Sequence, residues 1–141
     1  MDLRTGLSFW PIRNGLIAAY PPLERSESCD VAVVGAGIMG ALVAHRLAET
    51  GCDVVMVDRH DVALGSTAAS TGLLQYETDA TLTELAAQVG MERAVRSWRL
   101  GIEAIDGLEA LSAQVACDFA RRPSVYLASS RSDTRDLRAE Y

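Results

Sequence analysis

Apolar positions along the chain fall into runs with two different periods. Residues 31–34 and 52–57 are short, largely β-branched runs, typical of strands buried in a parallel sheet. Between them the apolar positions recur at helical spacing, and Gly51 is placed to end that helix. These helical positions are Ile38, Leu42, Val43 and Leu47. The pattern predicts a strand–helix–strand unit over residues 30–58.

Two amphipathic helices are predicted farther along the chain. Thr81 and Glu84 match a capping box, Asp79 is a second candidate cap, and Gly90 would end this short helix. A long helix is expected over residues 92–115, where apolar side chains again recur at helical spacing. They are Val95, Trp98, Ile102, Ile105, Leu108 and Leu111. If the Trp98, Ile102 and Ile105 side faces water, it favours self-association.

The last part of the chain predicts a short hairpin and a helix. Residues 117–121 and 125–128 resemble two strands around a turn, and Ser132 or Asp133 would open the final helix. That helix has only about two turns and no stop signal. Two parallel strands alone also leave an edge and an apolar face uncovered. We therefore expect this chain to be the front part of a longer protein.

Candidate chemistry lies at the joints of the strand–helix–strand unit. Gly35, Gly37 and Gly40 form a G-x-G-x-x-G pattern between the first strand and the helix. Such glycines allow a tight turn, close approach of a pyrophosphate and close packing of helix on strand. Asp58 ends the second strand about 20 residues later, where an acid accepts a ribose hydroxyl. The order of these parts predicts a Rossmann-like α/β unit that binds a dinucleotide.

Two plainer interpretations of this segment are disfavoured. Residues 31–44 lack charge, but they are shorter than the ~20 apolar residues that a membrane span needs. A similar fold that binds no nucleotide would leave Gly37 and Asp58 with little purpose in packing.

Composition narrows the class of protein. The 141 residues are 49% hydrophobic and 23% charged, which indicates a soluble globular chain of ordinary domain size. A formal net charge of -6 argues against binding nucleic acid. Cys29, Cys52 and Cys117 have no metal-ligand spacing, so no metal site is expected and a reducing cytoplasm is favoured.

The first 28 residues form an extension before the βαβ unit. They do not resemble a signal peptide, because no continuous apolar core follows Asp2 and Arg4. The Trp10–Pro11 and Pro21–Pro22 pairs are expected to break any helix. The aromatic residues suggest a segment that packs across a larger body, and a disordered arm is the alternative.

Residues 30–76 resemble the start of the D-amino-acid oxidase-like (DAO) family of FAD-dependent oxidoreductases, which includes glycine and sarcosine oxidases. The resemblance rests on the glycine fingerprint with Asp58 and Arg59, and on the segment GSTAASTGLLQYETD at residues 65–79. It implies a larger two-domain flavoprotein that binds FAD. Residues 29–141 would be the first part of its FAD-binding domain.

The resemblance also implies roles for individual residues on the adenine side of FAD. Gly35, Gly37 and Gly40 would line the pyrophosphate. Ile38 and Met39 would donate backbone N–H groups to it from the helix N-terminus. Two more residues follow the second strand: Asp58 would accept from the ribose and Arg59 would lie near the adenine.

The later segment would serve the phosphates and the flavin ring. By the same resemblance, Ser66 and Thr67 would donate to the phosphates. Thr71, Gly72 and Leu73 would pass close to the isoalloxazine. An ordinary polar loop is the alternative for residues 66–72. Catalytic residues and substrate contacts would lie beyond residue 141 and stay unassigned.

Three functions are compatible with these features. The favoured one is an FAD-dependent oxidoreductase whose full-length form oxidises an amino acid or related amine at the C–N bond. An NAD-dependent dehydrogenase would also suit Asp58, but it leaves residues 65–76 without a role. The third is a non-catalytic, truncated nucleotide-binding module.

Overall fold

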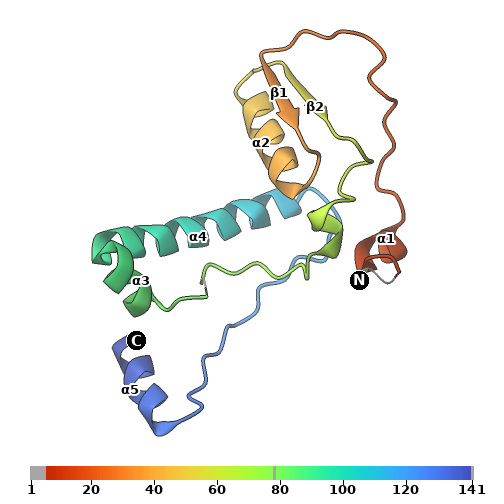
Figure 1. Cartoon of the computed structure of the whole chain (residues 1–141). Coiled ribbons are helices and arrows are strands. Elements are labelled where there is room, and N and C mark those ends of the chain that lie inside the picture. Colours follow the sequence, from red (N-terminus) through yellow and green to blue (C-terminus); the bar gives the residue numbers. More distant parts are fainter. Residues whose placement is uncertain (1–5, 78, 141) are drawn as a thin grey trace, which may run out of the picture. The chain divides into compact units, whose positions relative to one another are not determined.

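A computed structural model of the chain describes residues 6–77 and 79–140 (Figure 1). The chain divides into two compact units, Met1–Gly72 and Leu73–Tyr141. Helices and a small parallel sheet make up its regular structure. None of the helices in the described ranges combines the length and the apolar character that crossing a bilayer requires.

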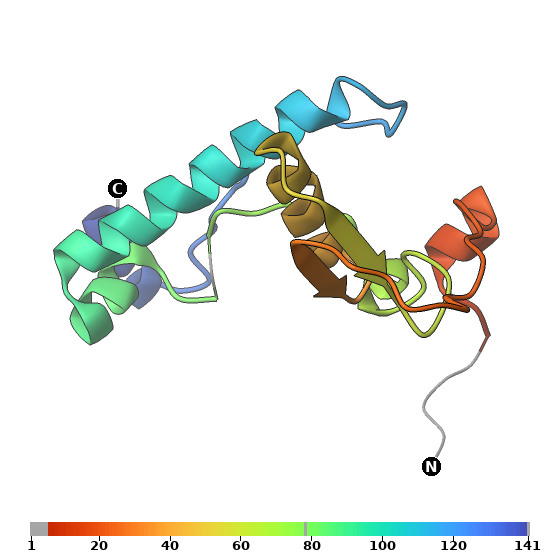
Figure 2. The ribbon, with the colours of Figure 1, turned by 90° about the horizontal axis from the view of Figure 1, so that it is seen from above.

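The first unit is built on β1 (Val31–Val34), α2 (Ile38–Glu49) and β2 (Val54–Val57). The strands pair in parallel, from Val31 opposite Val54 to Val34 opposite Val57. The predicted strand–helix–strand order is confirmed, although β2 begins two residues later than the apolar run suggested. Parallel pairing places the carboxyl ends of both strands, and the turns that follow them, at one edge of the sheet (Figure 2).

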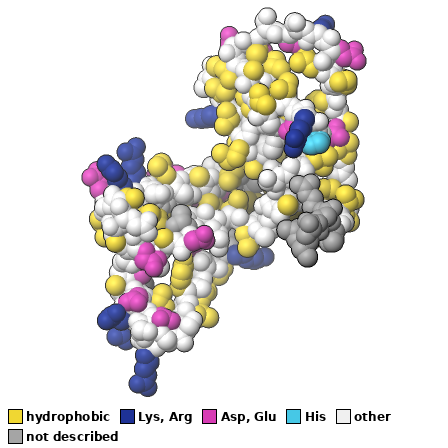
Figure 3. All heavy atoms as spheres, viewed as in Figure 1, with side chains coloured by type: hydrophobic (Ala, Val, Ile, Leu, Met, Phe, Trp, Pro, Cys, Tyr) yellow, Lys and Arg dark blue, Asp and Glu magenta, His cyan; other side chains and the backbone are white. Residues whose placement is uncertain are grey.

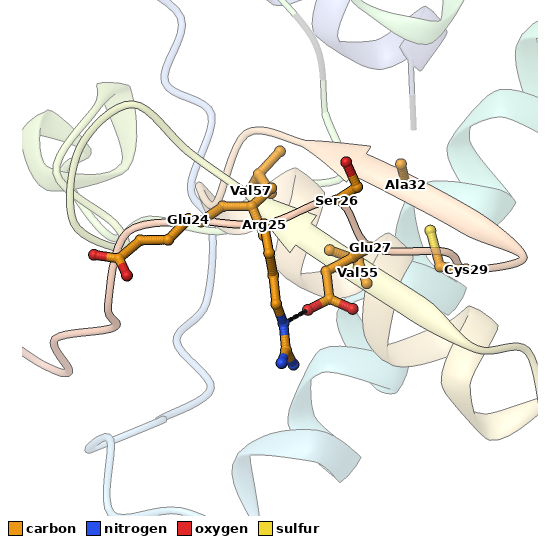
Figure 4. Close-up of a pocket in the computed structure, with 9 residues that line it drawn as sticks. Glu24, Arg25, Ser26, Glu27, Cys29, Ala32, Val55 and Val57 are labelled. Carbon is orange, nitrogen blue, oxygen red and sulfur yellow. Dashed lines mark hydrogen bonds and ion pairs between the residues drawn. The ribbon is translucent and has the colours of Figure 1, made fainter.

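The two faces of this small sheet are covered differently. Helix α2 packs on one face, where Gly40 lies against the Val33 side chain. On the opposite face, residues 23–29 run past Ala32, Val55 and Val57 and leave an open hollow (Figure 4). Val34 on this face is 85% exposed, and hydrophobic side chains gather over the β1–α2–β2 unit (Figure 3).

The extension before β1 contains the short helix α1 (Phe9–Asn14). The expectation that the Trp10–Pro11 pair breaks any helix is therefore wrong. Pro11 is the third residue of the helix, within the first turn, where a backbone N–H has no partner inside the helix. Helix α1 packs against η1 (Ser66–Ala69), a single 3₁₀ turn after β2. The described part of the extension thus packs on the first unit, as its aromatic content suggested.

The second unit contains α3 (Leu82–Val89), α4 (Met91–Ser112) and α5 (Arg131–Glu140). The capping box of α3 is confirmed: Thr81 Oγ1 accepts from the Glu84 N–H, and the Glu84 carboxylate accepts from the Thr81 N–H at 2.8 Å. The long helix also forms close to its predicted bounds, and Gly90 separates it from α3.

The predicted hairpin is wrong. Among the described residues the strands are β1 and β2, and residues 117–128 are irregular. An isolated two-stranded hairpin is marginal in water unless a larger sheet or a helix supports it. Here Arg121 instead pairs with Asp106 and Glu109 on α4, and Asp118 has a φ of 56°, which interrupts an extended strand.

The last helix begins at Arg131, one or two residues before the predicted start. Ser130 Oγ accepts from the Asp133 N–H, and the Asp133 carboxylate accepts from the Ser130 N–H at 2.9 Å. Asp133 therefore lies inside the first turn, and Ser130 acts as the cap.

Glu140, in the last turn of α5, joins that helix to the start of α3. Its carboxylate accepts from the backbone N–H groups of Leu82 and Thr83, the latter at 2.9 Å. Together with the Thr81 box, this satisfies donors that a helix N-terminus leaves without internal partners. The start of α3 is thus held both by its own capping box and by Glu140, which lies 58 positions after Leu82 in the chain.

The capping box generates a stability prediction. Thr81→Ala removes the side-chain acceptor for Glu84 N–H and should lower the free energy of unfolding by about 1 kcal/mol. Gln88→Ala, at an exposed position of the same helix, is the matched control and should change stability by no more than about 0.5 kcal/mol. Urea unfolding followed by circular dichroism measures both, and equal midpoints would contradict the role of the cap.

Candidate functional site

The candidate site is the edge of the sheet where β1 turns into α2. Gly35 has a φ of 110°, and its N–H donates to the Val57 carbonyl at 2.8 Å. At Gly40, a β-carbon would stand 1.8 Å from the Gly35 carbonyl oxygen. The turn and the first turn of α2 are therefore packed too closely for any other residue at position 40. This agrees with the predicted packing role of the third glycine.

Asp58 ties the end of β2 to this turn. One carboxylate oxygen accepts from the Ala36 N–H at 2.7 Å, and the other accepts from the His60 N–H at 2.8 Å. These two donors hold the pKa of the Asp58 carboxyl below its ordinary value. Ala36 itself is only 6% exposed, so its N–H points at the carboxylate from inside the packed turn. Asp58 is consequently ionised and fixed in orientation at neutral pH.

Two further contacts from the segment after β2 hold the same turn. Thr67 Oγ1 accepts from the Ile38 N–H at 2.9 Å, at the first residue of α2. Ala63, which has a φ of 62°, donates its N–H to the Ala36 carbonyl at 2.9 Å. Sequence reasoning missed Ala63, since an alanine carries no signal for a left-handed conformation.

This arrangement retains capacity to bind a ligand. Each oxygen of an ionised carboxylate accepts more than one hydrogen bond, so Asp58 can still accept from hydroxyl groups. The Thr67 hydroxyl accepts from Ile38 and keeps its own O–H free to donate. A β-carbon at Gly37 would lie 3.0 Å from Thr67 Oγ1, so the lack of a side chain there gives the Thr67 hydroxyl room to reach the Ile38 N–H.

The structure places the predicted site residues in four different settings. Hydrogen bonds and close packing join Gly35, Gly37, Ile38, Gly40, Asp58 and Thr67 around the turn. Met39, Arg59, Ser66 and Thr71 are exposed nearby in the same unit. Gly72 lies under the indole of Trp10. Leu73 begins the second unit and is 74% exposed.

The chain belongs to the DAO family of FAD-dependent oxidoreductases, whose family model matches residues 30–141. The match begins one residue before β1 and continues through α5. It therefore includes the glycine turn, Asp58 and Thr67.

Several curated proteins are similar to this chain. A probable oxidoreductase of Haemophilus influenzae, OrdL, is 34% identical over 87 residues, which are 62% of this chain and 20% of that protein. Gamma-glutamylputrescine oxidoreductase of Escherichia coli is 28% identical over 117 residues, 79% of this chain and 27% of that protein. One component of the anaerobic glycerol-3-phosphate dehydrogenase of Escherichia coli is 45% identical over 49 residues, 35% of this chain and 9% of that protein.

This chain thus spans about a quarter, or less, of the length of these relatives. No solved structure matches it significantly.

The cofactor of this family is FAD, and the residues at the sheet edge fit it. Gly40 allows α2 to approach the turn. Gly37, the residue before α2, carries no side chain that would keep a phosphate from the backbone. An ionised acid stands beside them at the end of β2. The family match offers no support for the NAD-dependent alternative.

The close packing at Gly40 can be tested with a matched pair of helix glycines. Gly40→Ala places a β-carbon where only a backbone shift can make room, so it should destabilise the protein and weaken FAD binding at least tenfold. Gly107→Ala lies in α4 with nothing within 4 Å of the new carbon, and should stabilise by about 0.5–1 kcal/mol. Thermal unfolding and FAD titration measure both. If both variants behaved alike, the tight approach at position 40 would be refuted.

Proposed function

We propose that this protein oxidises an amino acid or a related amine at a C–N bond, with FAD held at the sheet edge described above. The hydrogen bond between Ala36 N–H and Asp58 carries this proposal. It brings the strand-end acid to the glycine turn, an arrangement that suits the adenosine half of a dinucleotide. Residues 29–141 would form the first part of a Rossmann-like FAD-binding domain in a cytoplasmic enzyme, and residues 1–28 its extension.

On the adenine side, each residue has a proposed task. Gly35, Gly37 and Gly40 line the pyrophosphate, and the amides of Ile38 and Met39 face it from the N-terminus of α2. This role is supported by the partial positive charge at a helix N-terminus, which stabilises phosphate. The Ile38 amide donates to Thr67 Oγ1 at 2.9 Å. Phosphate binding would therefore require Thr67 Oγ1 to yield that donor or to share it.

Around the ribose and adenine, Asp58 and Arg59 are the proposed contacts. Asp58 accepts from a ribose hydroxyl while still accepting from Ala36 and His60, which keep its carboxylate oriented. Arg59 is exposed and follows directly, so its side chain can reach an adenine ring at the rim of the site.

The segment after η1 is proposed to follow the cofactor toward the flavin. Ser66 and Thr67 would donate to phosphate, and Thr71, Gly72 and Leu73 would run beside the isoalloxazine. Small residues and a glycine let backbone approach a flat ring. FAD would supply the hydride-accepting chemistry, and the protein residues would bind and orient it.

The amine substrate is supported by the longer of two matches. The relative named for gamma-glutamylputrescine aligns with 79% of this chain, whereas the one named for glycerol 3-phosphate aligns with 35%. The shorter match covers only 49 residues and therefore carries less weight for the substrate.

Self-association through the Ile102 side of α4 is a further proposal, since Ile102 is 40% exposed.

The cofactor and substrate are tested together on the protein as its gene encodes it. The purified protein should be yellow, and the released cofactor should be FAD rather than FMN, because only FAD has the adenosine that Asp58 would bind. Amines and amino acids should bleach the visible flavin band without oxygen, whereas glycerol 3-phosphate should not. A colourless protein that binds NAD, or bleaching by glycerol 3-phosphate alone, would contradict the proposal.

Asp58→Asn tests whether Asp58 contributes to FAD binding. The substitution keeps the shape but removes the charge, and a charge-assisted hydrogen bond contributes ~1.5–3 kcal/mol. FAD affinity should therefore fall roughly ten- to a hundredfold. Asp61→Asn, a nearby exposed acid, serves as control and should bind FAD as the parent protein does. Unchanged affinity in Asp58→Asn would mean that Asp58 does not contact the ribose.

A further inference from the structure

The indole of Trp10 lies against the segment that follows η1. Its Nε1–H donates to the Ser70 carbonyl at 2.8 Å, although the two residues are 60 positions apart. A β-carbon at Gly72 would stand 2.9 Å from Cζ2 of the same ring. The indole thus contacts residues 70–72 in two ways, through a hydrogen bond on one edge and through van der Waals contact on another.

Helix α1 holds the indole in place. The Phe9 ring meets it edge-to-face, with ring centroids 5.0 Å apart and planes at 76°. The Arg13 guanidinium lies 5.9 Å from the centre of the Trp10 ring, within the range of a cation–π contact. The helix itself ends at Gly15, whose N–H donates to the Pro11 carbonyl at 3.0 Å. Contacts within α1 therefore orient the indole independently of its contacts with residues 70–72.

The segment under the indole is irregular and exposed to solvent. Ser70, Thr71 and Gly72 are all exposed, and η1 before them is a single turn. The Gly72 N–H donates to Ser70 Oγ at 3.2 Å, and the Ser70 N–H donates to the Thr67 carbonyl at 3.2 Å. Both of these bonds are local in the sequence, whereas the bond from Trp10 reaches the segment from 60 positions away. Such a long-range contact restricts the conformations that an exposed loop can sample.

We propose that Trp10 is a positioning residue that fixes the backbone of Ser70–Gly72 for contact with FAD, so that the N-terminal extension forms part of the cofactor site. This inference rests on the proposed function, in which residues 71–73 run beside the isoalloxazine. A segment already held in its bound shape loses less conformational entropy when the cofactor arrives. Trp10 acts on FAD only through this segment.

If the Trp10 indole had only a structural role, it would stabilise α1 without affecting the flavin. Three variants separate this structural role from the positioning role. Trp10→Ala removes both contacts. Trp10→Phe keeps an aromatic ring over Gly72 but loses the donor to Ser70. Ile12→Ala is the matched control, because Ile12 lies on the same short helix with its side chain 67% exposed.

Two readouts are needed, both on the protein as its gene encodes it. Hydrogen exchange of the peptide spanning residues 66–73 is measured after the flavin is removed, and reports the anchoring itself. FAD affinity and the visible spectrum of the bound flavin at saturation report its consequence. The spectrum responds to the surroundings of the ring, which a general loss of stability does not change.

In Trp10→Ala, exchange of this peptide should accelerate and FAD affinity should fall on the order of tenfold, with an altered flavin spectrum. Trp10→Phe should recover part of the affinity and lie within roughly fivefold of the parent, since it lacks only one neutral hydrogen bond. Ile12→Ala should match the parent in every readout.

Unchanged exchange in both Trp10 variants would overturn the anchoring. Faster exchange with unchanged FAD affinity and spectrum would overturn its link to the cofactor. If the parent protein bound no FAD, the proposed function itself would be contradicted. If the parent and both Trp10 variants bound FAD equally well, only the role of Trp10 would be contradicted.

Discussion

The hydrogen bond from the Ala36 N–H to the Asp58 carboxylate organises the described part of the first unit. It closes the edge of the sheet by joining the turn after β1 to the end of β2. Ala36 is almost fully buried, so its amide needs a partner inside the protein. An ionised acceptor makes that bond stronger than a neutral one. We propose that the same carboxylate also accepts from a ribose hydroxyl of the cofactor.

Two more contacts reinforce this closure. Ala63 donates to the Ala36 carbonyl, and Thr67 accepts from the Ile38 amide. Each comes from the segment after β2 and acts on the turn after β1. The glycine turn is therefore held by the sequence that follows it, rather than by its own residues alone. Preorganisation of this kind lowers the ordering cost that a cofactor must overcome.

The electrostatic environment at this edge of the sheet depends on nearby backbone groups rather than on the net charge of the whole chain. The formal net charge is -6, and a dinucleotide is itself an anion. Overall charge thus opposes binding, and we propose that the oriented N–H groups at the start of α2 supply the attraction. Asp58 offsets its own negative charge by accepting from two backbone N–H groups, which is why its pKa is lowered and not raised.

Much of the fold could be predicted from local patterns. The strands, α2, the Thr81 capping box and the long helix follow from apolar period and cap residues, which act over a few positions. The glycine spacing and the family resemblance located the turn and Asp58. The family match at residues 30–141 confirms that resemblance.

The errors arise where distant contacts override local preference. Arg121 bonds to α4, and residues 117–128 stay irregular instead of forming the hairpin. The Pro11 error has a local cause instead, because a proline is tolerated in the first turn of a helix. The contacts of Trp10 with Ser70 and of Glu140 with Leu82 span about 60 positions. No periodicity in the sequence encodes such pairs.

We propose that the edge formed by the glycine turn and Asp58 holds the adenosine half of FAD. An experimental structure of the protein with FAD bound measures this most directly. We expect the pyrophosphate at the N-terminus of α2, beside Gly37 and Thr67, and a ribose hydroxyl within hydrogen-bond distance of the Asp58 carboxylate. FAD bound elsewhere, for example on the open sheet face beside Val55, with Asp58 still bonded only to Ala36 and His60, would contradict the account.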